Sequence, residues 1–118
     1  RESASIYIAD MLLEEKAILH IFDPQVNANQ IKFDLNYLKT RDESQNDKLI
    51  SIENDPYQAV KNSHAIAILT EWDEFTKYNW SRIYANMSKP AFIFDGRNIL
   101  NKKKLEEIGF FYKAIGKN

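Results

Sequence analysis

Two short apolar runs, at residues 65–69 and 91–94, place the strongest limit on what this chain can fold into. Residues 65–69 show no alternation between apolar and polar side chains, although a strand with one solvent-facing side would alternate. Strands without alternation are typical of parallel sheets, in which connecting helices cover both faces. The two runs therefore favour a fold built on a parallel sheet.

Helical patterns separate these runs from further short strands. Residues 3–16 carry a dense apolar stripe, and Trp80, Ile83 and Met87 are spaced for one helix face. Asp55-Pro56 is typical of a helix start, and Gly109 stands where a helix-ending glycine belongs. The sequence predicts helices at residues 3–16, 29–38, 55–62, 79–87 and 101–108, and strands at 17–22, 49–52, 65–69, 91–94 and 110–115.

Strands that alternate with helical patterns of about 10–15 residues imply right-handed crossover units. We therefore expect a Rossmann-like, doubly wound α/β domain with a mainly parallel sheet and helices on both faces. Such domains open with a strand, whereas this chain opens with a helix, and its first residue is Arg1. We expect residues 1–118 to be one domain of a longer protein, with a strand before Arg1, and the isolated fragment to be unstable or aggregation-prone.

Composition excludes several classes of function. The chain has no cysteine, which removes disulfides, thiolate metal sites and a cysteine nucleophile. A net charge of −1 argues against a nucleic-acid binder. No apolar run approaches the roughly 20 residues of a membrane span.

Polar residues follow three predicted strands, at Asp23, at Glu71-Trp72-Asp73 and at Asp95-Gly96-Arg97. In open parallel sheets, ligands bind beyond the carboxyl ends of the strands. Arg1 precedes the first helix, so Arg1 and Arg97 could face one crevice and hold a phosphate-bearing ligand. The alternatives are that Arg97 only pairs with a carboxylate such as Asp95, and that Arg1 is only solvated.

The remaining polar residues give weaker signals. Asp23 fits either a ribose-binding acid or the start of an Asp-Pro turn. Trp72 fits a packing anchor, and His20 a structural histidine inside a strand. His64 has no second ligand nearby, so no metal site is predicted. The three glycines form no phosphate-binding loop.

Several segments of the chain resemble one known family. They are Arg1-Glu2-Ser3, Ile21-Phe22-Asp23-Pro24, Asp55-Pro56-Tyr57, residues 70–75, residues 89–97, Ile108-Gly109-Phe110 and Ile115-Gly116-Lys117. In this order they are similar to the carboxyl-terminal, UDP-binding domain of the UDP-glucose/GDP-mannose dehydrogenase family, and in particular to its eukaryotic UDP-glucose 6-dehydrogenases.

The resemblance implies a cytoplasmic enzyme that oxidises UDP-glucose to UDP-glucuronate and reduces two NAD per turnover. It implies an amino-terminal NAD-binding domain in the same chain and a homo-oligomer, either a dimer or a hexamer. In the family's pattern, Arg97 matches the arginine that contacts the substrate, and Arg1 matches the arginine that reaches NAD. The family's cysteine nucleophile and its Phe-Lys substrate grip would lie before Arg1, so no catalytic residue is expected within the chain.

Two alternatives remain open from the sequence. One is a sister enzyme that takes another nucleotide sugar, such as UDP-N-acetylmannosamine. The other is a non-catalytic nucleotide-binding or regulatory module, such as a receiver-like domain with a phosphorylated Asp at a strand end. Asp23 and Asp95 stand at predicted strand ends, but neither has the acidic pair and the lysine that a receiver needs.

Overall fold

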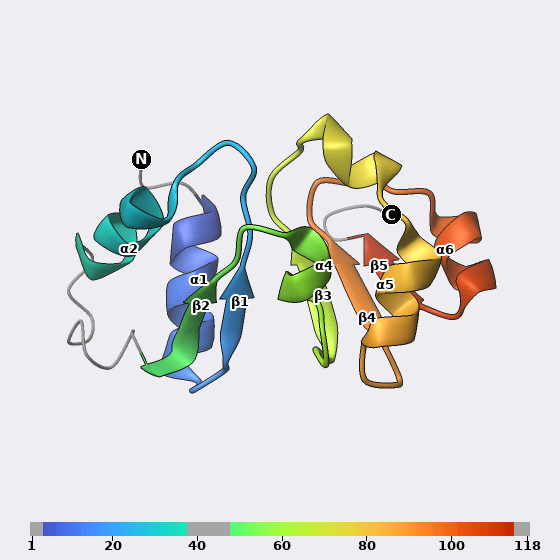
Figure 1. The fold of residues 1–118 in the computed structure, drawn as a ribbon, viewed down its shortest axis with the longest axis horizontal. Coiled ribbons are helices and arrows are strands. Elements are labelled where there is room, and N and C mark those ends of the chain that lie inside the picture. The colour runs from blue at the N-terminus through green and yellow to red at the C-terminus, as the bar shows by residue number, and fades with distance from the viewer. Residues whose placement is uncertain (1–3, 38–47, 115–118) are drawn as a thin grey trace. The chain divides into compact units, whose positions relative to one another are not determined.

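The computed structural model describes residues 4–37 and 48–114 (Figure 1). It has an α/β architecture with open, parallel sheets and connecting helices, which confirms the predicted Rossmann-like class. The chain divides after Ala59 into two compact units, Arg1–Ala59 and Val60–Asn118. Each unit contains one sheet, and each is described separately below.

The first unit is built on a two-stranded parallel sheet. Its elements are α1 (Ala4–Glu14), β1 (Leu19–Ile21), α2 (Ala28–Tyr37), β2 (Ile50–Ile52) and α4 (Pro56–Ala59). The register of β1 and β2 runs from the Leu19–Ile50 pair to the Ile21–Ile52 pair. Both strands are shorter than the apolar runs that predicted them.

Apolar side chains of the two longer helices form the core of this unit. Ile6 and Leu13 of α1 meet Ile31 and Leu35 of α2, and the apolar residues of β1 and β2 pack against this cluster. Ile6, Ala9 and Leu13 of the stripe in residues 3–16 therefore face inward, as its spacing predicted, whereas Met11 and Leu12 are 64% and 39% exposed. Nδ1 of His20, on β1, forms a hydrogen bond of 3.0 Å with the carbonyl oxygen of Ala59, which confirms the predicted structural histidine.

The second unit is built on a three-stranded parallel sheet with the order β3-β4-β5. Its elements are β3 (Ala65–Ile68), the 3₁₀ helix η1 (Asp73–Lys77), α5 (Trp80–Asn86), β4 (Phe92–Asp95), α6 (Lys102–Ile108) and β5 (Phe111–Ala114). The side-chain oxygens of Asn79 and Asn101 accept hydrogen bonds from the first turns of α5 and α6. These caps explain why both helices begin where the sequence predicted.

The central strand of this sheet has two different faces. On one side Ile93 and Asp95 are fully buried, and Ile83 of α5 and Leu105 of α6 are buried in the same unit. On the opposite side Phe92 stacks on Phe111, with ring centroids 5.4 Å apart. Phe111 is 60% exposed, so this apolar face is open in the described part of the unit.

The sequence misjudged one helix and missed another. The helix expected at residues 55–62 ends at Ala59, because Asn62 adopts a left-handed backbone (φ 63°) and turns the chain toward β3. Residues 73–77 form η1, a helix too short to produce a periodic pattern. The first difference moves the end of one helix, and the second adds a short helix between β3 and α5.

Candidate functional site

The turn that follows β4 carries the strongest candidate site residue, Arg97. Its geometry begins with Asp95, the last residue of the strand, which is fully buried. Strand side chains alternate between faces, so Asp95 points to the same side as Ile93. A carboxylate in this position must find donors inside the protein, because burying an unpaired charge is very costly.

Four donors meet the Asp95 carboxylate. Its Oδ1 accepts the backbone N–H of Arg97 at 3.2 Å, and its Oδ2 accepts the backbone N–H groups of Ile99 and Leu100 at 2.9 and 2.8 Å. The hydroxyl of Tyr112, on β5, donates to Oδ2 at 2.8 Å. The carboxylate therefore fixes the backbone of the whole turn.

The residues between these donors suit a tight turn. A Cβ atom at Gly96 would stand 3.0 Å from the backbone oxygen of Ile68, so a larger residue would press on the end of β3. Asn98 has a left-handed backbone (φ 57°), which asparagine tolerates better than most residues. The residue types at Gly96 and Asn98 and the hydrogen bonds to Asp95 therefore favour the same turn conformation.

The side chain of Arg97 leaves this turn toward solvent. Its Nε donates to Oε1 of Glu71 at 2.9 Å, and Nη2 contacts the same oxygen. The Arg97 and Glu71 side chains are 46% and 62% exposed. The carboxylate that pairs with Arg97 is therefore Glu71, beyond the end of β3, and not Asp95. Of the five N–H donors of a guanidinium group, these contacts use two.

The hydroxyl of Tyr112 has a clearly shifted pKa. Burial, and then the hydrogen bond and the negative charge of Asp95, raise the pKa of its hydroxyl well above the ordinary value of 10.0. The hydroxyl therefore remains a proton donor to Asp95 at physiological pH.

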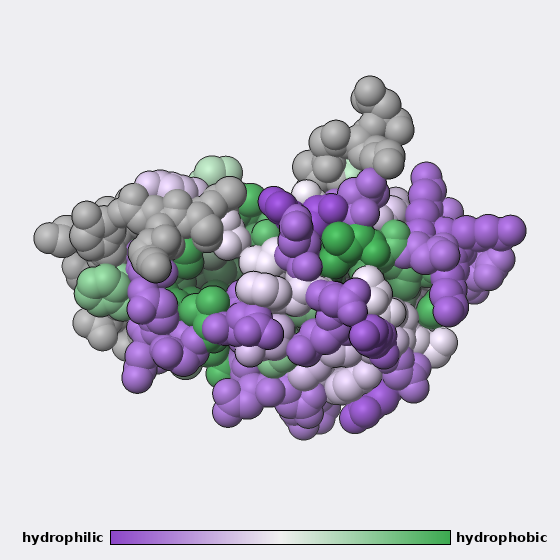
Figure 2. Space-filling model, turned by 90° about the horizontal axis from the view of Figure 1, so that it is seen from above, coloured by the Kyte–Doolittle hydropathy of each residue, from purple (hydrophilic) through white to green (hydrophobic). Residues whose placement is uncertain are grey.

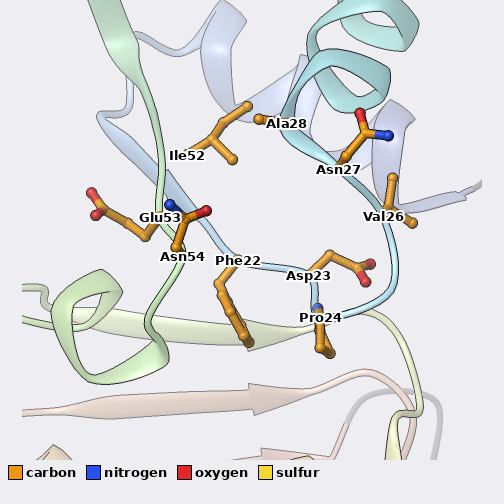
Figure 3. Close-up of a pocket in the computed structure, with 9 residues that line it drawn as sticks. All are labelled: Phe22, Asp23, Pro24, Val26, Asn27, Ala28, Ile52, Glu53 and Asn54. Carbon is orange, nitrogen blue, oxygen red and sulfur yellow. The ribbon is translucent and has the colours of Figure 1, made fainter.

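A cavity of about 380 Å³ lies in the first unit, beyond the carboxyl ends of β1 and β2 (Figure 3). Phe22, Pro24, Val26 and Ile52 supply its apolar lining, and the polar lining residues are Asp23, Asn27, Glu53 and Asn54. None of these side chains is a cation. The cavity is thus rich in hydrogen-bond acceptors and unsuited to phosphate.

Local hydrogen bonds already engage several of these polar groups. Asp23 accepts the backbone N–H of Gln25 at 2.8 Å, as an Asp-Pro turn start does. Asn27 accepts the N–H of Gln30 at 2.8 Å at the start of α2, and Glu53 accepts the hydroxyl of Ser51. The carboxylates of Asp23 and Glu53 point in opposite directions in Figure 3, so they do not converge on one ligand.

The other predicted residues have plainer surroundings. Arg1 lies outside the described residues, so no part of its predicted role is tested. Trp72 is half-buried before η1, and its Nε1 is buried without a hydrogen-bond partner. His64 is exposed, and residues 4–37 and 48–114 contain no cluster of potential metal ligands.

The surface is mostly hydrophilic where Figure 2 shows it, with smaller apolar areas between the polar residues. None of the helices in the described segments is long and apolar enough to cross a membrane. Asp95, the strand-end acid of the second unit, has no exposed surface, so it cannot serve as the phosphorylated Asp of a receiver-like module.

Comparison with known proteins points in the same direction as the motifs. Residues 1–102 match the UDP-binding domain of the UDP-glucose/GDP-mannose dehydrogenase family. The chain is similar to UDP-glucose 6-dehydrogenase of Drosophila melanogaster (47% identical over 99% of this chain) and of Caenorhabditis elegans (47% over 98%). It is also similar to UDP-glucose 6-dehydrogenase 2 of Arabidopsis thaliana (45% over 99%). It spans about a quarter of the length of each: 25%, 24% and 26%.

Proposed function

Because the chain belongs to the UDP-glucose/GDP-mannose dehydrogenase family, we propose that it is the substrate-binding domain of a longer, NAD-dependent UDP-glucose 6-dehydrogenase. The longer enzyme oxidises UDP-glucose to UDP-glucuronate and reduces two NAD per turnover. The observation that carries this assignment for the domain is the exposed guanidinium of Arg97 at the carboxyl end of β4.

In this turn the side chain of Arg97, and not the backbone, is the part that can bind a ligand. The backbone N–H groups of Arg97, Ile99 and Leu100 are occupied by Asp95, so they are unavailable to a phosphate. An arginine side chain offers several donors and no competing acceptor, which suits the diphosphate of a sugar nucleotide. Binding at this turn therefore depends on the guanidinium of Arg97.

Glu71 is the counter-ion of Arg97 when no substrate is bound. Both side chains are exposed to solvent, by 46% for Arg97 and 62% for Glu71, and exposed ion pairs are worth only about 0–1 kcal/mol. A diphosphate that offers two charged acceptors competes readily with one surface carboxylate. The pair thus keeps Arg97 extended without blocking substrate.

NAD is a partner of the longer enzyme, bound mainly outside this domain. The chain has no glycine-rich phosphate loop, and the amides of Gly96 and Arg97 donate to acceptors within the protein. We propose that Arg1 reaches NAD from this domain while an amino-terminal domain holds the cofactor. We further propose that the enzyme is cytoplasmic and a homo-oligomer, either a dimer or a hexamer.

Removal of the Arg97 side chain tests this function. In the full-length enzyme, Arg97→Ala should raise the KM for UDP-glucose and the Kd for UDP roughly 10- to 100-fold, the effect of losing a hydrogen-bonded charge. Arg82→Ala is the matched control, because it removes an exposed arginine from α5 in the same unit. An Arg97→Ala enzyme with unchanged KM and Kd contradicts the assignment.

A further inference from the structure

The anchoring of the Arg97 turn is more elaborate than a surface turn requires. Most exposed turns are held by one or two local hydrogen bonds, as at Asp23 in the first unit. The turn after β4 is instead tied to a carboxylate with no solvent exposure.

The contacts bear directly on where Arg97 points. The Asp95 carboxylate holds the amide nitrogen of Arg97 itself and, from the other side of Asn98, the amides of Ile99 and Leu100. The Cα atom of Arg97 therefore lies between backbone groups that the Asp95 carboxylate holds in place. The side chain of Arg97 starts from this held Cα position.

Tyr112 fixes the carboxylate in its turn. The tyrosine lies on β5, and its hydroxyl holds Oδ2, the oxygen that also accepts Ile99 and Leu100. This hydrogen bond joins the turn to β5, the strand that pairs with β4. A tyrosine hydroxyl with the ordinary pKa of 10.0 already keeps its proton near neutral pH, and the raised pKa of Tyr112 extends this range to more alkaline pH.

We propose that Asp95 and Tyr112 are positioning residues for the diphosphate of the sugar nucleotide, acting through Arg97. Their role rests on the proposed function of Arg97. Ordering a flexible side chain on binding costs about 0.5–1.5 kcal/mol, and a backbone fixed in advance lowers that cost. Neither Asp95 nor Tyr112 touches the ligand in this arrangement.

A double-mutant cycle in the full-length enzyme tests the positioning role, with UDP as the titrated probe. Tyr112→Phe removes one hydroxyl and should raise the Kd for UDP about 3- to 10-fold. Its kcat at saturating UDP-glucose should stay within about twofold of wild type. In an Arg97→Ala background the same substitution should change the Kd by less than about 1.5-fold, because the side chain to be positioned is gone.

Tyr78→Phe is the matched control, since it also removes a tyrosine hydroxyl that donates to a carboxylate in this unit, that of Glu74. It should leave the Kd unchanged. Asp95→Asn should weaken UDP binding more than Tyr112→Phe does, and Tyr112→Phe carries the test if Asp95→Asn fails to fold.

Each outcome supports or overturns a defined statement. A Tyr112→Phe effect that is equally large with and without Arg97 shows a merely structural role and overturns the positioning role. An unchanged Kd for UDP in Tyr112→Phe also overturns the positioning role. If Arg97→Ala binds UDP more weakly than wild type in that case, the proposed function stands. An unchanged Kd in Arg97→Ala overturns both.

Discussion

Each unit has an aspartate at or just beyond the end of a parallel strand, and the two aspartates differ in burial and in their hydrogen-bond partners. Asp23 follows β1 by two residues, is half-buried, and accepts one N–H from its own loop. Asp95 ends β4, is fully buried, and gathers three amides and a tyrosine hydroxyl. The difference shows that a buried strand-end acid can join several elements, whereas a partly exposed one shapes only its own turn.

The consequence for ligands follows from the charge that each loop presents. The loops of the first unit expose acceptors, namely the carboxylates and side-chain amides that help to line its cavity. The turn of the second unit uses its acid internally and presents a cation, Arg97. An anionic sugar nucleotide is therefore matched by the second unit.

The largest expected effect separates the buried acids of the two units. Asp95→Ala leaves four donors without an acceptor and should lower the free energy of unfolding by roughly 3–5 kcal/mol. Asp34→Ala in α2 removes a buried carboxylate for which the partner is the side chain of Gln30. It should cost about 1 kcal/mol or less. Urea denaturation of the full-length protein measures both, and equal losses would remove the distinction between the acids.

The geometry of β4, which includes Asp95, explains why this residue points inward, although the predicted strand ended at residue 94 and Asp95 was considered as a partner for Arg97 or as the strand-end acid of a receiver-like module. Ile93 and Asp95 are two positions apart, so one buried residue implies the other. A buried acid followed by Gly96 and Asn98 then points to a turn whose amides face the carboxylate. The elements around it were predictable because caps at Asn79 and Asn101 and apolar runs are local signals.

Contacts between distant segments were not predictable in this way. Arg97 and Glu71 lie 26 residues apart, and Tyr112 and Asp95 lie 17 apart. Their pairing depends on the neighbour order of the strands, which places the ends of β3 and β5 beside the end of β4. Single-sequence patterns report the strands but not which side chains meet across them.

Alkaline pH should weaken the second unit through Tyr112. The pKa of this tyrosine is raised in the folded state, so the unfolded chain loses the proton first as the pH passes the ordinary value of 10.0. The contribution of Tyr112 to stability is therefore complete below about pH 10 and falls above it, by at most about 1.4 kcal/mol per pH unit for one proton.

Urea denaturation between pH 9 and pH 11 checks this dependence. The wild-type free energy of unfolding should fall more steeply over this range than that of Tyr112→Phe. Parallel curves for the two proteins would show that the hydroxyl has no raised pKa in the folded state.

A smaller effect concerns the counter-ion of Arg97. Glu71→Gln removes the charge that competes with a diphosphate, so UDP should bind about two- to fivefold more tightly at low ionic strength. The gain should shrink as salt is added, because the pair is exposed and screened. Calorimetric titrations of UDP at two salt concentrations measure it. Weaker binding in Glu71→Gln would mean instead that Glu71 holds Arg97 in its productive direction.

The smallest expected effect is at the strand-end acid of the first unit. Asp23→Asn keeps the oxygen that accepts the Gln25 amide, so the turn should persist and stability should change by less than about 0.5 kcal/mol. The substitution removes a negative charge from the lining of the cavity. If the cavity held a ribose, its hydroxyls would lose a charged acceptor, and the KM for UDP-glucose or for NAD would rise several-fold. We expect both KM values to remain within twofold of wild type, because the cation that an anionic nucleotide needs lies in the second unit, on Arg97.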